Sequence, residues 1–373
     1  MNERFQYVET IAQLQAVVDT CSKASVIAVD TEFARFNTYY PIVGLIQIAT
    51  IDDCFLIDPL AVVELSSLKV IFQNKDIIKV FHACSEDLEV FQYSFGCVPE
   101  PLFDTQVAAA MLGVGFSMSY QRLVQHWLGI DLPKDQTRSD WLARPLSKEQ
   151  LQYAALDVVH LLHICTLQEE ELAATGKRAW LLEESASLGQ DIPTMIDPQL
   201  AYKKLKGLWQ LERRQLNRLR ALCAWREETA RKENKPRNRI ADQKALMNIV
   251  RHNFSDRRSL QQASELSQRQ LRKYGDDLLR VMREADEIGD DDLPREIDRD
   301  AASLNRATLK RLKKIVNDKA EELSISPELL TKRRHLEKLI RSSEGLGVPQ
   351  LPEGLLGWRS AAVGGDLIEA LAE

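Results

Sequence analysis

Residues 26–33 read Val-Ile-Ala-Val-Asp-Thr-Glu-Phe, and this stretch determines the fold class because it joins a buried strand to two acidic side chains. The four leading apolar residues predict a strand that is covered on both faces, which argues against an exposed edge strand. Side chains alternate along a strand, so Asp30 and Glu32 lie on the same side of the sheet. We expect the pair at the strand's C-terminal end, where α/β sheets usually bind ligands. Like charges repel there unless a cation compensates them.

Strand and helix patterns alternate around this stretch. The apolar runs at residues 44–50 and 54–58 are separated by three residues, which indicates a hairpin. Residues 77–81 predict a fourth strand that leads into a helix over about 85–95, with Ser85 as its N-cap. A hairpin followed by strand–helix alternation is typical of a mixed α/β sheet.

The sequence is helical after about residue 115. Before that point, Asp104 and Thr105 are suited to cap a short helix over 106–112. A long helix is expected from Ser147 to about residue 172, because Gln150 stands in capping-box position behind the serine.

Two further segments carry acidic residues that bear on function. Asp87 lies near the start of the helix at 85–95, where its charge is also favourable simply because it stabilises the first turn. Tyr153 and Asp157 are four residues apart on the long helix and share one face. A structural Tyr–Asp hydrogen bond is the alternative to a metal site at that face. His82, at the end of the fourth strand, either contacts substrate or serves the fold.

The four carboxylates and the tyrosine together suit phosphodiester hydrolysis. That reaction needs an activated water and a stabilised leaving oxygen, which two divalent ions about 3.5–4 Å apart supply. Hard oxygen ligands favour Mg²⁺ or Mn²⁺, and a tyrosine hydroxyl can position the attacking water. The proposed metal ligands are the carboxylates of Asp30, Glu32, Asp87 and Asp157.

Length and composition indicate a soluble protein of two or three domains. The chain has 373 residues, of which 45% are hydrophobic and 28% charged, as in ordinary globular proteins. No apolar run approaches the roughly 18 residues that a membrane span needs, and no signal peptide is evident. The six cysteines form no Cys-x-x-Cys pair, so we expect a cytoplasmic protein in a reducing compartment.

Charge is distributed unevenly along the chain. Residues 1–195 carry 13 Lys and Arg against 26 Asp and Glu, whereas residues 200–285 carry 22 against 10. An acidic domain for metal chemistry beside a basic domain for a polyanion explains this division. A helical segment with a solvated basic face is the simpler alternative.

The C-terminal half is expected to hold two small all-helical domains. Residues 239–250 are similar to 329–340, and this weak repeat predicts a duplication. The alternative is that two helical segments share only their apolar period. Linker-like stretches at 190–198 and 287–294 separate the parts. The predicted domains are residues 1–195, 200–288 and 293–373.

Three motifs resemble those of the DEDDy class of 3′→5′ exonucleases, and within it the ribonuclease D family. They are Asp-Thr-Glu-Phe at 30–33, His-Ala-Cys-Ser-Glu-Asp at 82–87 and Tyr-Ala-Ala-Leu-Asp at 153–157. The stretches 39–41, 44–47, 104–106 and 140–146 fit as well. The helical repeats resemble the HRDC domains of that family, so the resemblance covers essentially the whole chain.

The resemblance implies a ribonuclease H-like nuclease domain followed by two HRDC-like domains. It implies that Asp30 bridges two metal ions, that Glu32 and Asp157 complete one shell, and that Asp87 holds the other ion. Tyr153 then orients the nucleophilic water. The family acts on the 3′ ends of structured RNA, notably tRNA precursors, and releases nucleoside 5′-monophosphates.

The basic segment gains a role from this resemblance, since its arginines can neutralise phosphates of the RNA body. The expected contacts are Arg213, Arg214, Arg237 and Arg239, with His82 nearer the active site. A monomer is expected, because nothing demands an oligomer. Three other interpretations stay open: DNA as the substrate, a binding module with a vestigial nuclease domain, and helical domains that dock proteins.

Overall fold

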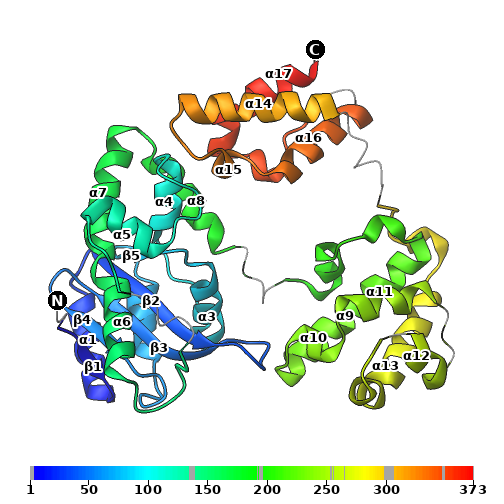
Figure 1. Cartoon of the computed structure of the whole chain (residues 1–373), viewed down its shortest axis with the longest axis horizontal. Helices are drawn as coiled ribbons and strands as arrows, with labels where there is room; N and C mark the ends of the chain where they lie inside the picture. The colour runs from blue at the N-terminus through cyan, green and yellow to red at the C-terminus, as the bar shows by residue number, and fades with distance from the viewer. Residues whose placement is uncertain are drawn as a thin grey trace. The chain divides into compact units, whose positions relative to one another are not determined.

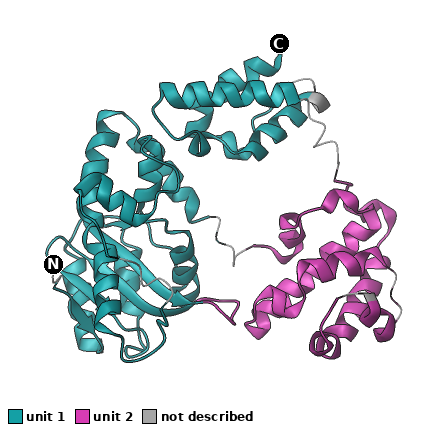
Figure 2. Ribbon diagram, viewed as in Figure 1, with its two compact units in different colours: residues 1–34, 42–192, 304–373 teal, residues 35–41, 193–303 magenta. Residues whose placement is uncertain are grey.

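The computed structural model describes residues 4–133, 139–190, 192, 196–252, 254, 256–263, 265–297, 306–346 and 349–372. The chain forms two compact units (Figure 2). Unit 1 contains residues 1–34, 42–192 and 304–373, and unit 2 contains residues 35–41 and 193–303. Within the described part of the chain, no helix is long and apolar enough to cross a membrane. The linker expected at 190–198 falls partly on residues 191 and 193–195, which lie outside the described residues.

Unit 1 is built on one mixed sheet, which confirms the predicted α/β class. Its described strands lie in the order β1-β4-β3-β2-β5-β6. The β2–β3 and β3–β4 pairs are antiparallel, whereas the β1–β4, β2–β5 and β5–β6 pairs are parallel. The strands are β1 (Gln6–Val8), β2 (Val26–Ala34), β3 (Ile42–Ala49), β4 (Cys54–Ile57), β5 (Ile78–Phe81) and β6 (Leu102–Asp104).

The expected position of the acidic pair at the end of its strand is wrong. β2 runs on to Ala34, so Asp30 and Glu32 lie within the strand. The reason is the antiparallel partner, since β3 pairs with β2 from Ala28 onward while the parallel partner β5 stops at Ala28. A register shift between Glu32 and Phe33 interrupts this ladder directly beside the pair. The acidic pair therefore lies in the part of β2 that pairs with β3 but no longer with β5.

Helices cover both faces of the sheet (Figure 1). The apolar residues of β2 divide between two cores, one that continues into α6 and α7 and one that continues into α1 and α3. The helices of this part are α1 (Ile11–Cys21), α2 (Lys69–Phe72), α3 (Ser85–Phe95), α4 (Thr105–Met111), α5 (Tyr120–Leu128), α6 (Lys148–Val159), α7 (Leu161–Ala174) and α8 (Arg178–Leu188).

Two expected helix details are corrected by the structure. Ser85 is the first residue of α3 and not its cap; Cys84 occupies the cap position, and its amide donates to the Asp104 carboxylate over 2.9 Å. The long helix from Ser147 is interrupted at His160, so α6 and α7 are separate. At the break the His160 amide donates to Val158 O, while Leu156 O accepts the Tyr120 hydroxyl over 2.8 Å. The predicted capping box of Ser147 and Gln150 and the Asp104 cap of α4 are both present.

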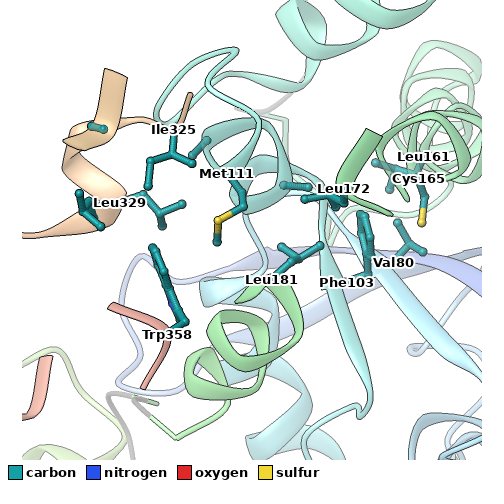
Figure 3. Packing of buried hydrophobic residues seen from close by; sticks show 14 of the residues in the cluster. Val80, Phe103, Met111, Leu161, Cys165, Leu172, Leu181, Ile325, Leu329 and Trp358 are labelled. Carbon is teal, nitrogen blue, oxygen red and sulfur yellow. The ribbon is translucent and has the colours of Figure 1, made fainter. Parts of the chain in front are cut away.

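The second helical domain shares a hydrophobic core with the nuclease domain in unit 1. Figure 3 shows Ile325 and Trp358 of the helical domain on one side of Met111 of α4, with Leu181 of α8 on the other side. This domain consists of α14 (Arg306–Glu322), α15 (Pro327–Leu330), α16 (Arg333–Leu346), the π-helical turn Ser360–Gly364 and α17 (Gly365–Ala372).

Polar contacts complete this joint. The Lys177 ammonium bridges it by donating to Met111 O at 3.1 Å and Ser324 O at 2.9 Å. The Trp358 indole stacks on Trp180 with centroids 5.2 Å apart and donates to Glu184 over 3.1 Å. Glu184 also pairs with Arg359 at 2.6 Å. A buried tryptophan, a shared carboxylate and a bridging lysine fix the second helical domain to the nuclease domain.

Unit 2 contains the first helical domain together with the loop that joins β2 to β3. Its helices are α9 (Arg213–Glu233), α10 (Arg237–Ile240), α11 (Gln243–Arg251), α12 (Arg257–Ala263) and α13 (Gln268–Asp286). Tyr39 of the loop is 2% exposed and packs in their core. The Tyr39 hydroxyl donates to Glu227 of α9, and both accept from Arg237, with 2.9 Å to the hydroxyl and 2.5 Å to the carboxylate. Asn234 Oδ1 accepts the amides of Tyr39 and Tyr40 at 3.0 Å each.

Candidate active site

Three of the predicted carboxylates meet at one face of the sheet. The ligand oxygens of Asp30, Glu32 and Asp157 all lie within 4.8 Å of one another. Asp30 and Glu32 come from the same side of β2, and Asp157 descends from α6, which packs across that side. The spacing of two on the strand and the inward face of the helix together produce this cluster.

Asp87 approaches the same strand from α3. It is 7% exposed, and its carboxylate accepts the hydroxyl of Thr31, the residue between Asp30 and Glu32. Its pKa lies well above the usual range because of burial and because of the nearby Asp30 charge. The fourth predicted carboxylate is therefore coupled electrostatically to Asp30 of the cluster.

The site is suited to a cation. Burial raises the pKa of Asp30 well above its usual range, and the charge of Asp157 raises it further. Opposite Asp30 in the β2–β3 register stands Gln47, which is fully buried and whose amide has no hydrogen-bond partner among the described residues. Directly paired residues share a face. A hard divalent ion would offset the repulsion between these carboxylates and could accept oxygen ligands from them.

Two tyrosines border the carboxylates, and the sequence pointed to only one. Tyr153 lies one turn before Asp157 on α6, with its ring 6.1 Å from that of Trp141. Tyr120, which sequence reasoning missed, has a pKa well above the usual range because of burial and because of the charges of Asp157 and Asp30. Nothing in the local pattern around Tyr120 indicates this position, because the sheet and α6 come from distant parts of the chain.

An ion pair behind the site orients the segment that leads into α6. Arg144 donates to Asp58 through Nε at 2.6 Å and Nη2 at 2.7 Å, and also to Gly44 O at 2.6 Å. The Tyr7 hydroxyl is a second donor to Asp58, at 2.7 Å. Burial alone would raise the pKa of Asp58, but the hydrogen bonds from Arg144 and Tyr7 lower it to about 2. The segment before α6 is thus tied to β1, β3 and the end of β4.

The residues predicted to contact substrate are divided between the two units, and most of them are engaged by the fold. His82 is engaged by the fold, with Nδ1 2.9 Å from Thr105 Oγ1 and Nε2 3.1 Å from Met118 O. Arg213 donates to the carbonyls of Asp290, Leu293 and Pro294, and Arg214 pairs with Asp290 at 2.5 Å. Arg237 belongs to the Tyr39–Glu227 network, whereas Arg239 is exposed beside a hollow in unit 2.

Comparison with known families assigns the three parts of the chain. Residues 5–173 match the family described as 3′-5′ exonuclease, and residues 215–282 match the HRDC domain family. Residues 305–367 match the C-terminal HRDC domain of ribonuclease D.

Relatives named ribonuclease D match nearly the whole chain. A ribonuclease D of Pseudomonas paraeruginosa is 41% identical over 345 residues, covering 92% of each chain. The ribonuclease D of Escherichia coli is 35% identical and covers 99% of each chain. The chain belongs to the ribonuclease D family. The crystal structure of E. coli RNase D, described as an exoribonuclease involved in structured RNA processing, aligns with a TM-score of 0.91 over 99% of each chain at 34% identity.

Membership in the ribonuclease D family defines the reaction class and the fold. The chain is a 3′→5′ exoribonuclease with a ribonuclease H-like nuclease domain and two HRDC domains. The catalytic core of RRP6 from Trypanosoma brucei is a more distant neighbour, with a TM-score of 0.60 at 27% identity over 76% of this chain.

Proposed function

We propose that this exoribonuclease trims the 3′ ends of structured RNA, including tRNA precursors, by two-metal-ion hydrolysis that releases nucleoside 5′-monophosphates. The observation that carries the proposal is the cluster of Asp30, Glu32 and Asp157 at one face of the sheet, with Asp87 adjacent. The E. coli relative is an exoribonuclease involved in structured RNA processing, and this supports the substrate class.

The carboxylates of Asp30, Glu32, Asp87 and Asp157 are the groups that would hold the two ions, Mg²⁺ or Mn²⁺. Bound divalent ions acidify a water molecule and offset the charge that develops on the phosphate. Tyr153 would orient that water through its hydroxyl. Thr31 holds the Asp87 carboxylate by a hydrogen bond, so that it faces the strand that carries Asp30 and Glu32.

We propose that the chain is a monomer of three domains, at residues 1–195, 200–288 and 293–373. His82, Arg213, Arg214, Arg237 and Arg239 remain proposed RNA contacts, with Arg239 favoured by its exposure. All six cysteines are free and buried, which supports a cytoplasmic, reducing location.

A time course on a 5′-labelled tRNA with a short 3′ extension tests the proposal. The parent protein with Mg²⁺ should shorten the RNA one nucleotide at a time from its 3′ end, and EDTA should stop the reaction. Asp157→Asn should slow it by at least about a hundredfold. Glu170→Gln is the matched control, because Glu170 is an exposed carboxylate on the next helix.

A DNA strand of the same sequence, run beside the RNA, tests the sugar. Shortening of the DNA alone would contradict the proposed substrate, and so would shortening of the RNA that continues unchanged in EDTA. Mass spectrometry of the released products decides whether they are 5′-monophosphates.

A further inference from the structure

The first helical domain contains a concave basic surface that the active site does not use. A hollow of about 590 Å³ lies in unit 2. Four cations line it against one carboxylate, Asp242, so it carries a clear positive excess. We call it the basic hollow; its cationic lining residues are Lys235, Arg239, Arg269 and Lys273.

Two of the four cations are uncommitted. Arg239 and Arg269 are exposed, and no carboxylate of the described residues forms an ion pair with either of them. Lys235 and Lys273, by contrast, share the carboxylate of Glu233, which also accepts the Tyr274 hydroxyl over 2.9 Å. Glu233 therefore holds the two lysines in place, while the two arginines keep their hydrogen-bond donors available to a ligand.

The wall of the hollow combines both parts of unit 2. Asn37 of the β2–β3 loop contributes an amide, and Tyr274 of α13 contributes an aromatic ring with Lys273 Nζ 5.0 Å from its centroid. The buried Tyr39, two residues after Asn37, fixes the loop to α9 through Glu227. The hollow is therefore composite and is complete only while the loop between β2 and β3 stays packed in the helical domain.

We propose that the basic hollow binds consecutive phosphates of the RNA backbone, with Arg239 and Arg269 as the direct contacts. This inference rests on the proposed function and names one site for the substrate body. Guanidinium groups form paired hydrogen bonds to phosphate oxygens, and backbone contacts position an RNA without reading its sequence. Arg213, Arg214 and Arg237 are less suited to this task, because each is engaged inside the domain.

The test is an RNA-binding titration over a salt series, performed in EDTA so that no cleavage occurs. The variant Arg239→Gln/Arg269→Gln should lower the slope of log affinity against log salt by roughly 1.5, since each lost contact removes about 0.7–0.9. Its affinity at low salt should fall by about tenfold.

Two further variants separate a defined site from general attraction. Arg257→Gln/Arg280→Gln removes the same charge from the same domain, but these arginines already pair with Asp276 and with Asp277 and Glu284. It should keep the parent's affinity and slope within about twofold. Arg239→Lys/Arg269→Lys retains the charge and should keep most of the slope.

Equal losses of RNA affinity in the two glutamine variants would contradict a defined site at the basic hollow and indicate diffuse electrostatic attraction. Parental affinity and salt slope in Arg239→Gln/Arg269→Gln would also contradict the proposal. Failure of the proposed function is recognised separately, because the parent protein would then leave RNA unshortened in Mg²⁺ whatever these variants bind.

Discussion

The two helical domains are both of the HRDC type and share an order of helices, yet they make different kinds of contact. In each, a long helix is followed by a four-residue helix and then a longer one, α9–α10–α11 in the first and α14–α15–α16 in the second. The second domain joins the nuclease domain through an apolar core that contains Trp358 and Ile325. The first holds the β2–β3 loop through a charged network centred on Glu227.

This contrast indicates different tasks for two domains of the same type. Residues 286–373 carry 14 Lys and Arg against 18 Asp and Glu, whereas residues 200–285 carry 22 against 10. Arg239 and Arg269 of the first domain are exposed and form no ion pair with a described carboxylate. By contrast, Arg359 and Lys177, at the joint between the second domain and the nuclease domain, are used inside the protein. We infer that the second domain serves mainly as a scaffold and the first as the RNA-binding domain.

Mutation of the apolar joint, the core shared by the second helical domain and the nuclease domain, should cause the largest loss of stability. Trp358→Ala removes a side chain that is 3% exposed, and it should cost about 3–5 kcal/mol of unfolding free energy. Leu356→Ala is the control, because Leu356 is 52% exposed and should change stability by less than about 0.5 kcal/mol. Calorimetry measures both values, and equal destabilisation by the two changes would refute the joint.

The charged network should yield a somewhat smaller effect. Glu227 is 1% exposed, and its burial works against ionisation, yet the hydrogen bonds from Arg237 and Tyr39 lower its pKa. Glu227→Gln leaves Arg231 and Arg237 without their counter-charge, at a cost of about 3 kcal/mol. Hydrogen exchange should accelerate at the amides of Tyr39 and Tyr40 but not at Ser326 in the apolar joint. Uniform acceleration would show that the two regions are not independent.

Acid should weaken the nuclease domain to which the apolar joint belongs. The folded-state pKa of Asp58 is depressed to about 2, so its contribution is fully present above the unfolded value of about 3.9 and is lost as pH falls toward 2. The loss amounts to about 2 kcal/mol. Denaturant unfolding across this window should show the loss in the parent and a smaller one in Arg144→Met. An identical acid dependence in the two proteins would contradict the assignment to this pair.

Removal of positive charge from the second helical domain should have the smallest effect on RNA affinity. Lys332 and Lys338 lie in a groove that also contains the carboxylates of Glu183, Glu184 and Glu353. We expect Lys332→Gln/Lys338→Gln to change RNA affinity by less than about twofold, since nearby carboxylates already offset these charges. A loss of RNA affinity as large as that of Arg239→Gln/Arg269→Gln would contradict the inference that the two domains have different tasks.

The features that the sequence predicted are local ones. The strand at 26–29, the capping box of Ser147 and the shared face of Tyr153 and Asp157 each follow from a few neighbouring residues. The corrections arise from partners elsewhere in the chain. β2 is longer than its apolar run because β3 pairs with it, and α6 ends early where Tyr120 contacts Leu156 O.

The contacts that could not be predicted join distant positions. Arg144 and Asp58 are 86 residues apart, and Tyr39 and Glu227 are 188 apart. No periodicity or short spacing in the sequence indicates that either pair is in contact. Composition alone identified the basic segment, but it does not reveal which arginines form contacts within the fold. Arg214 and Arg239 cannot be distinguished in the sequence, whereas the structure pairs Arg214 with Asp290.

Calorimetric titration of the protein with Mn²⁺ is the sharpest test of the proposed metal site, because it reads the carboxylate cluster without needing a substrate. We expect saturable binding by the parent and by Glu170→Gln, and a loss of at least about tenfold in affinity for Asp157→Asn. Binding that is unchanged in Asp157→Asn would contradict a metal site built from Asp30, Glu32 and Asp157.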